Sequence, residues 1–160
     1  MRRLTLLRHA EAQPLDYLRI STDRDRPLTQ DGEALARNTA QDLANTAKPP
    51  THILASPATR TLQTARIMAA ALGLGERATS VENRIYEASP EALFSLIRQQ
   101  SDAVEHLLLC GHNPGISLLV HDLAAGDPPP PLAPCELVTL DFEIENWAEI
   151  RTASGQQQDT

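Results

Sequence analysis

An arginine and a histidine stand together at the end of the first apolar segment, in the run Leu6-Leu7-Arg8-His9. An imidazole can attack phosphorus as a nucleophile, and an arginine supplies planar, permanently charged donors that suit phosphate oxygens. A histidine at the carboxyl end of a buried strand also lies where open α/β sheets bind their ligands. The pair therefore indicates phosphoryl chemistry more than metal binding.

Two later segments repeat this pattern of an apolar strand followed by a basic side chain. Arg60 lies in the first turn after the second strong apolar run, and His112 follows the third. Because the carboxyl ends of parallel strands meet at one edge of a sheet, we expect both residues to join Arg8 and His9 in one crevice. The helices that follow these strands would also aim free N–H groups toward that edge, which favours an anion.

This set of side chains fits transfer of a phosphoryl group through a covalent phosphohistidine. His9 must then present an unprotonated ring nitrogen to phosphorus while its other nitrogen donates to a backbone carbonyl. Arg8 and Arg60 would hold the phosphoryl oxygens, and a protonated His112 would stabilise the transition state. A carboxyl group must protonate the leaving oxygen, and Glu87 is the candidate because it follows a short further strand.

The composition is typical of one soluble domain. The chain has 160 residues, of which 41% are hydrophobic, so it is long enough to bury a core. Fourteen basic residues against twenty-one acidic ones give a net charge of -7, which argues against a nucleic-acid partner. No apolar run is long enough to span a bilayer, so we expect no membrane contact. The two cysteines make no disulfide framework and no signal peptide is evident, which favours the cytoplasm.

Apolar segments alternate with helical patterns, and this alternation predicts a three-layer α/β/α sandwich with a mostly parallel central sheet. The expected strands span residues 4–7, 52–55, 80–85 and 105–110, and the expected helices span residues 30–46, 58–72, 90–99 and 114–125. Thr29 and Ser56 are expected to cap the first two helices, because their hydroxyl oxygens can accept from free backbone N–H groups.

The carboxyl-terminal part of the chain is expected to add antiparallel structure. Residues 136–142 and 147–152 have the pattern of a β-hairpin, and the proline run 128–131 is expected to be a stiff connector. Residues 154–160 are polar and are expected to be disordered. Since the sequence shows no internal repeat, we expect one domain over residues 1–153 followed by this tail.

Three motifs together resemble the histidine phosphatase superfamily, whose members share the phosphoglycerate-mutase-like fold. The motifs are Leu-Arg-His at 7–9, Ser-Pro-Ala-Thr-Arg-Thr-Leu-Gln-Thr-Ala at 56–65 and Gly-His-Asn-Pro at 111–114. The resemblance covers nearly the whole chain. The short length and the segment Arg-Pro-Leu-Thr at 26–29 are most similar to the SixA branch, whose members remove phosphate from phosphohistidine in signalling proteins.

The resemblance implies a role for individual residues. His9 would be the phosphoacceptor, and Arg26, which precedes Pro-Leu-Thr, would face the phosphate. The candidate catalytic residues are Arg8, His9, Arg60, Glu87 and His112, and the candidate substrate-binding residues are Arg8, Arg26, Arg60, His112 and Asn113. No metal or other cofactor is implied.

Two positions depart from the pattern of the family. Ala10 stands where the superfamily usually has glycine. With an alanine at this position, the backbone must adopt a φ angle that residues with a Cβ can reach. Glu87 provides an acid in a region where the SixA branch often lacks a clear one. Because imidazole needs less help to leave than an alkoxide, a well-placed Glu87 would extend the possible substrates to phosphate monoesters.

Each candidate also has an ordinary structural explanation when it is taken alone. A histidine can close a strand or a turn, and Arg60 can be a solvated arginine early in a helix. Arg26 belongs to a charged run, and Glu87 can be a loop acid that faces solvent. The convergence of three distant segments favours the catalytic interpretation.

The leading hypothesis is a metal-independent phosphatase that forms a phosphohistidine on His9. The five histidines show no short-spaced pair typical of metal ligands. A phosphohistidine on a protein is the favoured substrate, because so short a chain leaves few residues to build a lid. The alternatives are a phosphatase of small phosphate monoesters and a non-catalytic phosphate-binding module. Opposed protonation of His9 and His112 would give a bell-shaped pH profile.

Overall fold

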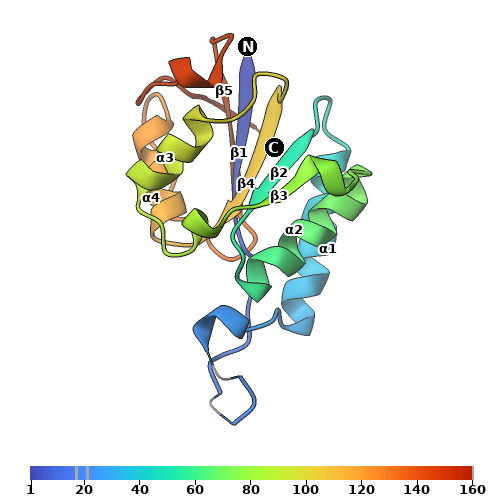
Figure 1. Ribbon diagram of the computed structural model, residues 1–160. Coiled ribbons are helices and arrows are strands. Elements are labelled where there is room, and N and C mark those ends of the chain that lie inside the picture. Colours follow the sequence, from blue (N-terminus) through green and yellow to red (C-terminus); the bar gives the residue numbers. More distant parts are fainter. Residues whose placement is uncertain (17, 21, 160) are drawn as a thin grey trace.

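A sheet of six strands forms the centre of the computed structural model, which describes residues 1–16, 18–20 and 22–159 (Figure 1). The strands lie in the order β3-β2-β4-β1-β5-β6. Their bounds are β1 Arg2–Arg8, β2 His52–Ala55, β3 Thr79–Val81, β4 His106–Gly111, β5 Leu137–Phe142 and β6 Gln156–Gln158. Strands β1 to β4 run parallel, whereas β5 pairs antiparallel with β1, and β6 pairs antiparallel with β5 at the edge of the sheet. The prediction of a mostly parallel sheet is confirmed.

Four α-helices cover the two faces of this sheet (Figure 1). They are α1 Gln30–Ala44, α2 Thr59–Leu72, α3 Pro90–Arg98 and α4 Gly115–Leu123. Four short 3-10 helices lie in the loops: η1 Asp23–Asp25, η2 Glu76–Ala78, η3 Asn83–Ile85 and η4 Trp147–Glu149. Helices α1 and α2 pack on one face and α3 and α4 on the other, which is the predicted three-layer sandwich. None of these helices is long and apolar enough to cross a bilayer, as far as the described residues go.

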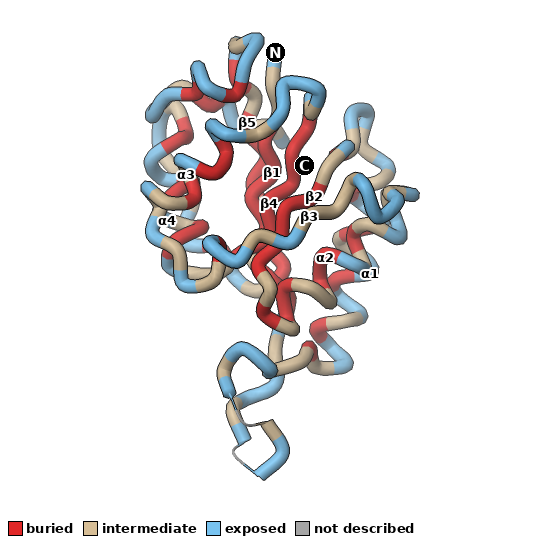
Figure 2. Tube along the Cα trace, in the orientation of Figure 1, coloured by how far each residue is buried: buried red, intermediate tan, exposed pale blue. Residues whose placement is uncertain are grey.

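Alternating side chains of the central strands separate the core into two parts. Leu6 and Leu109 belong to the part beneath α3 and α4, whereas Leu7 and Leu108 belong to the part beneath α1 and α2. This division follows from the two-residue period of a strand, which sends neighbouring side chains to opposite faces. The strands are therefore buried on both sides, as Figure 2 shows for the centre of the fold.

The ends of the helices follow their sequence signals with one exception. The Oγ1 atom of Thr29 accepts a hydrogen bond from the backbone N–H of Gly32 at 2.9 Å, so the expected cap of α1 is confirmed. Ser56 does not cap α2, because the helix begins later, with Ala58 at the capping position. The Ser56 hydroxyl instead lies 2.7 Å from Nε2 of His112, so it belongs to the surroundings of that ring.

The expected carboxyl-terminal hairpin is wrong. Strand β5 pairs with β1 and β6, while Trp147 begins the 3-10 helix η4. The physical reason is burial: the Trp147 indole is fully buried and donates from Nε1 to the Val104 carbonyl at 2.8 Å. Part of the expected disordered tail, residues 156–158, forms the edge strand β6, held by backbone pairing to β5. Thr160 lies outside the described residues.

Candidate active site

The four basic residues that follow the central strands come together at one edge of the sheet. Arg8 ends β1 and His9 follows it, Arg60 lies in the first turn of α2, and His112 directly follows β4. The ring centroids of His9 and His112 are 5.4 Å apart. Since β1 and β4 are parallel neighbours and β2 pairs with β4, the topology itself brings these side chains into one crevice.

The ring of His9 is held in the form that can attack an electrophile. Its Nδ1 lies 2.7 Å from the carbonyl oxygen of Ala10, to which it donates. Nε2 accepts from Nε of Arg60 at 3.3 Å, and because a guanidinium can only donate, Nε2 carries the lone pair. Burial of the ring, together with three nearby arginines, lowers the pKa of His9 from 6.5 to about 4. The neutral ring is therefore the resting form at neutral pH.

Ala10 fits the site without the glycine that the family usually has there. Its side chain is fully buried, and its backbone N–H donates to Oγ1 of Thr64 at 3.1 Å. Its φ is not positive, since the non-glycine residues with positive φ in the described chain are Glu87, Cys135 and Ala153. An alanine is therefore accommodated without backbone strain.

Arg60 lies between the two imidazole rings and is 5% exposed. Its Nη2 donates to Nδ1 of His112 at 3.3 Å, so that nitrogen is an acceptor, and Nε2 of His112 donates to the Ser56 hydroxyl. Burial, followed by the positive charge of Arg60, lowers the pKa of His112 to about 3. His112 is therefore neutral in the free protein, and its protonation in the transition state stays a prediction.

A carboxylate from the loop between β1 and α1 completes the surroundings of Arg60. The Oδ2 atom of Asp23 accepts from Nη2 of Arg60 at 3.1 Å and from the hydroxyl of Tyr86 at 2.8 Å. The Asp23 carbonyl accepts from Nη1 of Arg60 at 2.7 Å. Burial raises the pKa of Asp23, but the hydrogen bonds and positive charges around it outweigh this effect and hold the pKa below its usual value. An ionised carboxylate thus occupies donors that a phosphoryl group could use.

Sequence reasoning missed Asp23, Tyr86 and the true place of Ser56. Asp23 looked like part of a solvated charge run, Tyr86 was only a neighbour of Glu87, and Ser56 looked like a helix cap. The available signal for Asp23 was its position three residues before Arg26, a spacing that brings both side chains to one side of a helical turn. That turn is the 3-10 helix η1.

Arg26 reaches this cluster through Asp23. Its Nε donates to Oδ1 of Asp23 at 2.9 Å, and its Nη1 donates to the Gln13 carbonyl at 3.1 Å. Its charge contributes to the lowered pKa of His9, which places it within electrostatic reach of the ring. The guanidinium is therefore part of the positive surroundings of the site, tied to the carboxylate that pairs with Arg60.

Arg8 and Asn113 share one anchor, the carbonyl oxygen of Leu132. Arg8 donates to it from Nη1 at 3.0 Å, and Asn113 donates from Nδ2 at 2.8 Å. The amide oxygen of Asn113 accepts from the hydroxyl of Ser117. Both ends of the Asn113 amide thus have partners within the protein, while the residue also lines the cavity beside His112, so its role in substrate binding stays a prediction. Asn113 fixes the segment that orients Arg8.

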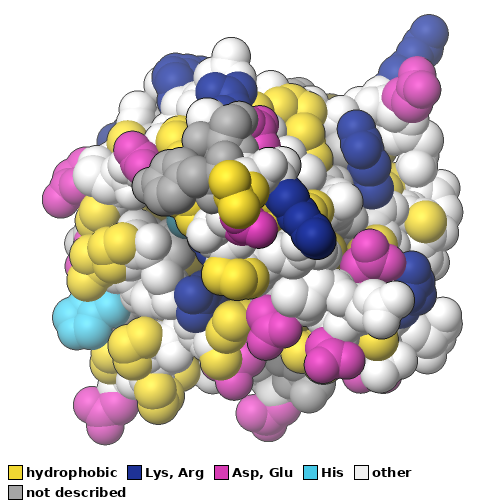
Figure 3. Space-filling view, turned by 90° about the horizontal axis from the view of Figure 1, so that it is seen from below, with side chains coloured by type: hydrophobic (Ala, Val, Ile, Leu, Met, Phe, Trp, Pro, Cys, Tyr) yellow, Lys and Arg dark blue, Asp and Glu magenta, His cyan; other side chains and the backbone are white. Residues whose placement is uncertain are grey.

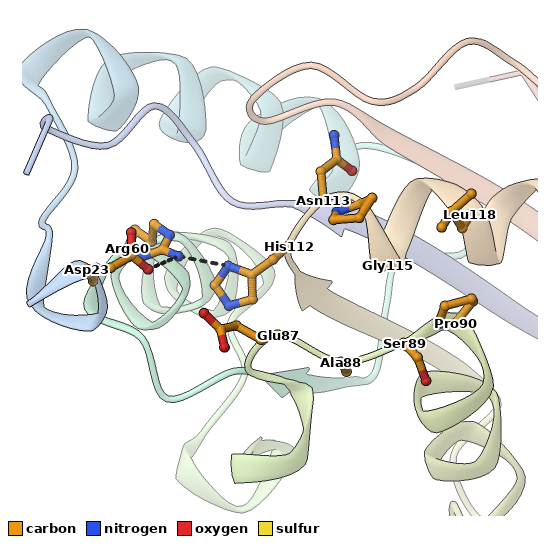
Figure 4. A pocket seen from close by; sticks show the side chains of 11 residues that line it. Asp23, Arg60, Glu87, Ala88, Ser89, Pro90, His112, Asn113, Gly115 and Leu118 are labelled. Carbon is orange, nitrogen blue, oxygen red and sulfur yellow. Dashed lines mark hydrogen bonds and ion pairs between the residues drawn. The ribbon is translucent and has the colours of Figure 1, made fainter.

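Glu87 lies beside His112 in a strained conformation (Figure 4). Its φ is 54°, in the left-handed region that residues with a Cβ rarely adopt, and such outliers cluster at functional sites. The loop is locked against α4, because a Cβ on Gly115 would lie 2.2 Å from the Ala88 carbonyl oxygen. Close approach of the backbone at a glycine therefore keeps the Glu87 carboxyl at the site.

Glu87, Arg60, His112 and Asp23 line one end of a cavity of about 460 Å³. On the face of the molecule at this edge of the sheet, acidic, basic and hydrophobic side chains are interleaved (Figure 3). Attraction for an oxyanion is therefore local, in the arginine cluster beneath this face. No group of three or more His, Cys, Asp or Glu side chains suited to a metal ion was found among the described residues.

A neutral imidazole, buried guanidinium donors and a nearby carboxyl group meet at the carboxyl-terminal edge of a mostly parallel α/β sheet. Residues 4–94 match the sequence model of the histidine phosphatase superfamily (branch 1). The chain belongs to this superfamily, and within it the solved structures that it resembles include phosphohistidine phosphatases of the SixA type. Membership of this superfamily supports phosphatase activity.

Three similar proteins illustrate the relationship. An uncharacterized chloroplast protein of Arabidopsis thaliana is 33% identical over 162 residues, which cover 96% of this chain and 72% of that protein. A protein of Agrobacterium tumefaciens, provisionally named phosphohistidine phosphatase SixA, is 30% identical, with a TM-score of 0.78 and coverage of 88% and 91%. The protein histidine phosphatase SixA in complex with tungstate has a TM-score of 0.80 at 21% identity, with coverage of 98% and 94%.

The protonation of the two rings can be tested directly. With pKa values of about 4 and about 3, His9 and His112 should stay neutral as the pH falls from about 7 to about 5, since a lowered pKa extends the neutral form to more acidic pH. Nuclear magnetic resonance of the ring carbons measures this, with His9→Ala and His112→Gln assigning the signals. A midpoint near 6.5 for either ring would contradict the described site.

The role of Asp23 as a competing anion can be tested by removing its charge. Asp23→Asn removes the negative charge but keeps the backbone carbonyl that accepts from Arg60. Inorganic phosphate should therefore bind about fivefold more tightly, which corresponds to the ~1 kcal/mol of repulsion between two unit charges about 4 Å apart. Calorimetric titration measures the affinity. Asp25→Asn, in the same 3-10 helix, removes an equal charge and is the matched control. Weaker binding by Asp23→Asn alone would show that the carboxylate orients Arg60 instead.

Proposed function

We propose that the protein is a phosphatase that acts through a covalent phosphohistidine on His9, without a metal ion, and that its substrate is a phosphohistidine on a protein. The observation that carries the proposal is the arrangement of Arg60 between two neutral rings, with the Nε2 lone pair of His9 facing its guanidinium. A tetrahedral oxyanion placed at Arg60 would have the nucleophile on one side and His112 on another.

The reaction would proceed in two balanced steps. The lone pair of His9 attacks phosphorus, a bond forms between Nε2 and phosphorus, and the bond from phosphorus to the leaving nitrogen or oxygen breaks. Glu87 in its protonated form donates its proton to the leaving atom and becomes a carboxylate. Water then attacks phosphorus, so that a bond forms between the water oxygen and phosphorus and the bond from Nε2 of His9 to phosphorus breaks. The Glu87 carboxylate accepts a proton from this water, inorganic phosphate departs and neutral His9 is regenerated.

The remaining side chains stabilise charge on the phosphoryl oxygens. Arg60 supplies donors from within the site, and Arg8 and Arg26 add positive charge near His9. His112 becomes protonated once the phosphoryl charge is present, because a nearby anion raises the pKa of an imidazole. Its second nitrogen already has a partner in Ser56, which fixes the ring as the proton arrives.

The choice of a protein substrate rests on two supports. Chemically, an imidazole leaving group needs little assistance, so hydrolysis does not depend on a perfectly placed acid. By similarity, the Agrobacterium relative and the tungstate complex carry the names phosphohistidine phosphatase and protein histidine phosphatase. Both supports point to a phosphoramidate on a protein side chain.

The proposal predicts release of phosphate from a phosphohistidine peptide in the presence of EDTA. His9→Ala should abolish this release, since the covalent intermediate cannot form, while His121→Ala, an exposed histidine on α4, should leave it intact. An enzyme-coupled assay of free phosphate at neutral pH measures the release, because an acidic reagent would itself hydrolyse phosphohistidine. Sustained turnover by His9→Ala would reject the nucleophile, loss of activity with EDTA would reject metal independence, and phosphate binding with no turnover would indicate a non-catalytic module.

A second candidate function, hydrolysis of small phosphate monoesters, is favoured by the strained conformation of Glu87 at the cavity. If Glu87 is a general acid, Glu87→Gln should slow an alkyl phosphate by about 100-fold or more and phosphohistidine much less. Initial rates on both substrates measure the difference. Glu91→Gln, an exposed acid in the first turn of α3, is the control. Equal losses on both substrates would argue against a role in leaving-group protonation.

A further inference from the structure

The cavity that contains Arg60 and His112 is larger than a phosphoryl group requires. Its volume of about 460 Å³ lies in the range of sites that hold drug-sized molecules. From Glu87 it continues between the amino-terminal ends of α3 and α4 (Figure 4). A phosphoryl group bound at Arg60 would therefore leave most of this cavity for whatever carries it.

The far end of the cavity is apolar. Its lining there consists of Ala88, Pro90, Pro114 and Leu118, together with Ser89 and Gly115, and the polar Asn113 stands at its border with His112. No charged side chain stands among these residues, whereas the near end carries Asp23, Glu87 and Arg60. The cavity is thus divided into a charged end, where the phosphoryl group would lie, and an apolar end.

Leu118 gives the apolar end its largest exposed side chain. It is 48% exposed on α4, while its neighbour Leu119 is buried in the core. A single exposed leucine is ordinary on a protein surface. The location distinguishes this one, because Leu35 on α1 is also 48% exposed but does not line the cavity.

The apolar end is also preformed. The Ala88 carbonyl lies so close to Gly115 that a Cβ there would approach to 2.2 Å, which fixes the loop before α3 against α4. Ser89 caps α3 by accepting from the N–H of Ala92 at 3.2 Å. Two prolines, Pro90 and Pro114, further restrict the backbone of the walls. A rigid apolar wall binds an apolar group without the cost of ordering itself.

We propose that the apolar end, formed by Ala88, Pro90, Pro114 and Leu118, binds an apolar side chain that flanks the phosphohistidine in the substrate polypeptide. This inference rests on the proposed function, because the phosphoryl group must enter through the same cavity. With its phosphoryl group at Arg60, the substrate places its leaving imidazole toward Glu87 and its flanking residues beyond. Two carboxylates, Asp23 and Glu87, disfavour an acidic flanking residue there.

The test compares two leucine variants on two kinds of substrate. The substrates are a phosphohistidine peptide with a leucine next to the phosphorylated residue and the small phosphoramidate phosphoimidazole, which cannot reach the apolar end. Leu118→Ser should lower the ratio of kcat/KM for the peptide to kcat/KM for phosphoimidazole by about tenfold, with the loss in KM, as expected for losing contact with one leucine. Leu35→Ser, equally exposed, should not change the ratio.

A peptide with serine in place of the flanking leucine should show no such dependence on Leu118. An unchanged ratio in Leu118→Ser, or an equal change in Leu35→Ser, would overturn the proposal. Binding of the fluorescently labelled peptide to the His9→Ala variant, with and without Leu118→Ser, separates this inference from the proposed function. If Leu118→Ser weakens peptide binding while the wild-type protein shows no turnover, the proposed phosphatase function is wrong and the apolar binding site is supported.

Discussion

The burial of one guanidinium, that of Arg60, governs the state of the whole site. A buried charge must be paired or surrounded by acceptors, and Arg60 has a carboxylate from Asp23 on one side and two ring nitrogens on the other. Those nitrogens can accept only if both rings are neutral. Burial of the rings, and then the charge of Arg60, lowers the pKa of both His9 and His112. The hydrogen bonds from the guanidinium make the ring nitrogens that face it acceptors.

The fold supplies this arrangement through short connections at one edge of the sheet. The register of β1 against β4 places Arg8 opposite Gly111, so the residues that follow each strand are neighbours by construction. Loops distant in the sequence then fix the positions of individual side chains. The Leu132 carbonyl holds Arg8 in place, and the glycine at 115 admits the backbone of the loop that carries Glu87. This edge of the sheet thus combines a topology that brings the side chains together with loops whose positions are fixed by single close contacts.

The sequence predicts the positions of side chains that directly follow a strand, but not the positions of side chains that depend on how a long loop folds. His9, Arg60 and His112 could be placed together because each lies directly after a strand whose apolar pattern is clear. Asp23 could not, because its position depends on how the long connection between β1 and α1 folds back on α2, which no local pattern encodes. The hairpin failed for a related reason: the apolar residues around Trp147 fit a strand, but burial in the core places them in a 3-10 turn.

Substrate binding must rearrange the charges that stabilise the free protein. The phosphoryl group and the Asp23 carboxylate both need the outer donors of Arg60, and they repel each other when both are present. At the same time, an added negative charge acts to raise the pKa of His112, which the free protein holds at about 3. In the proposed mechanism the neutral ring of the free protein and the charged ring of the transition state are therefore two states of one site, and the bound phosphoryl group favours the second.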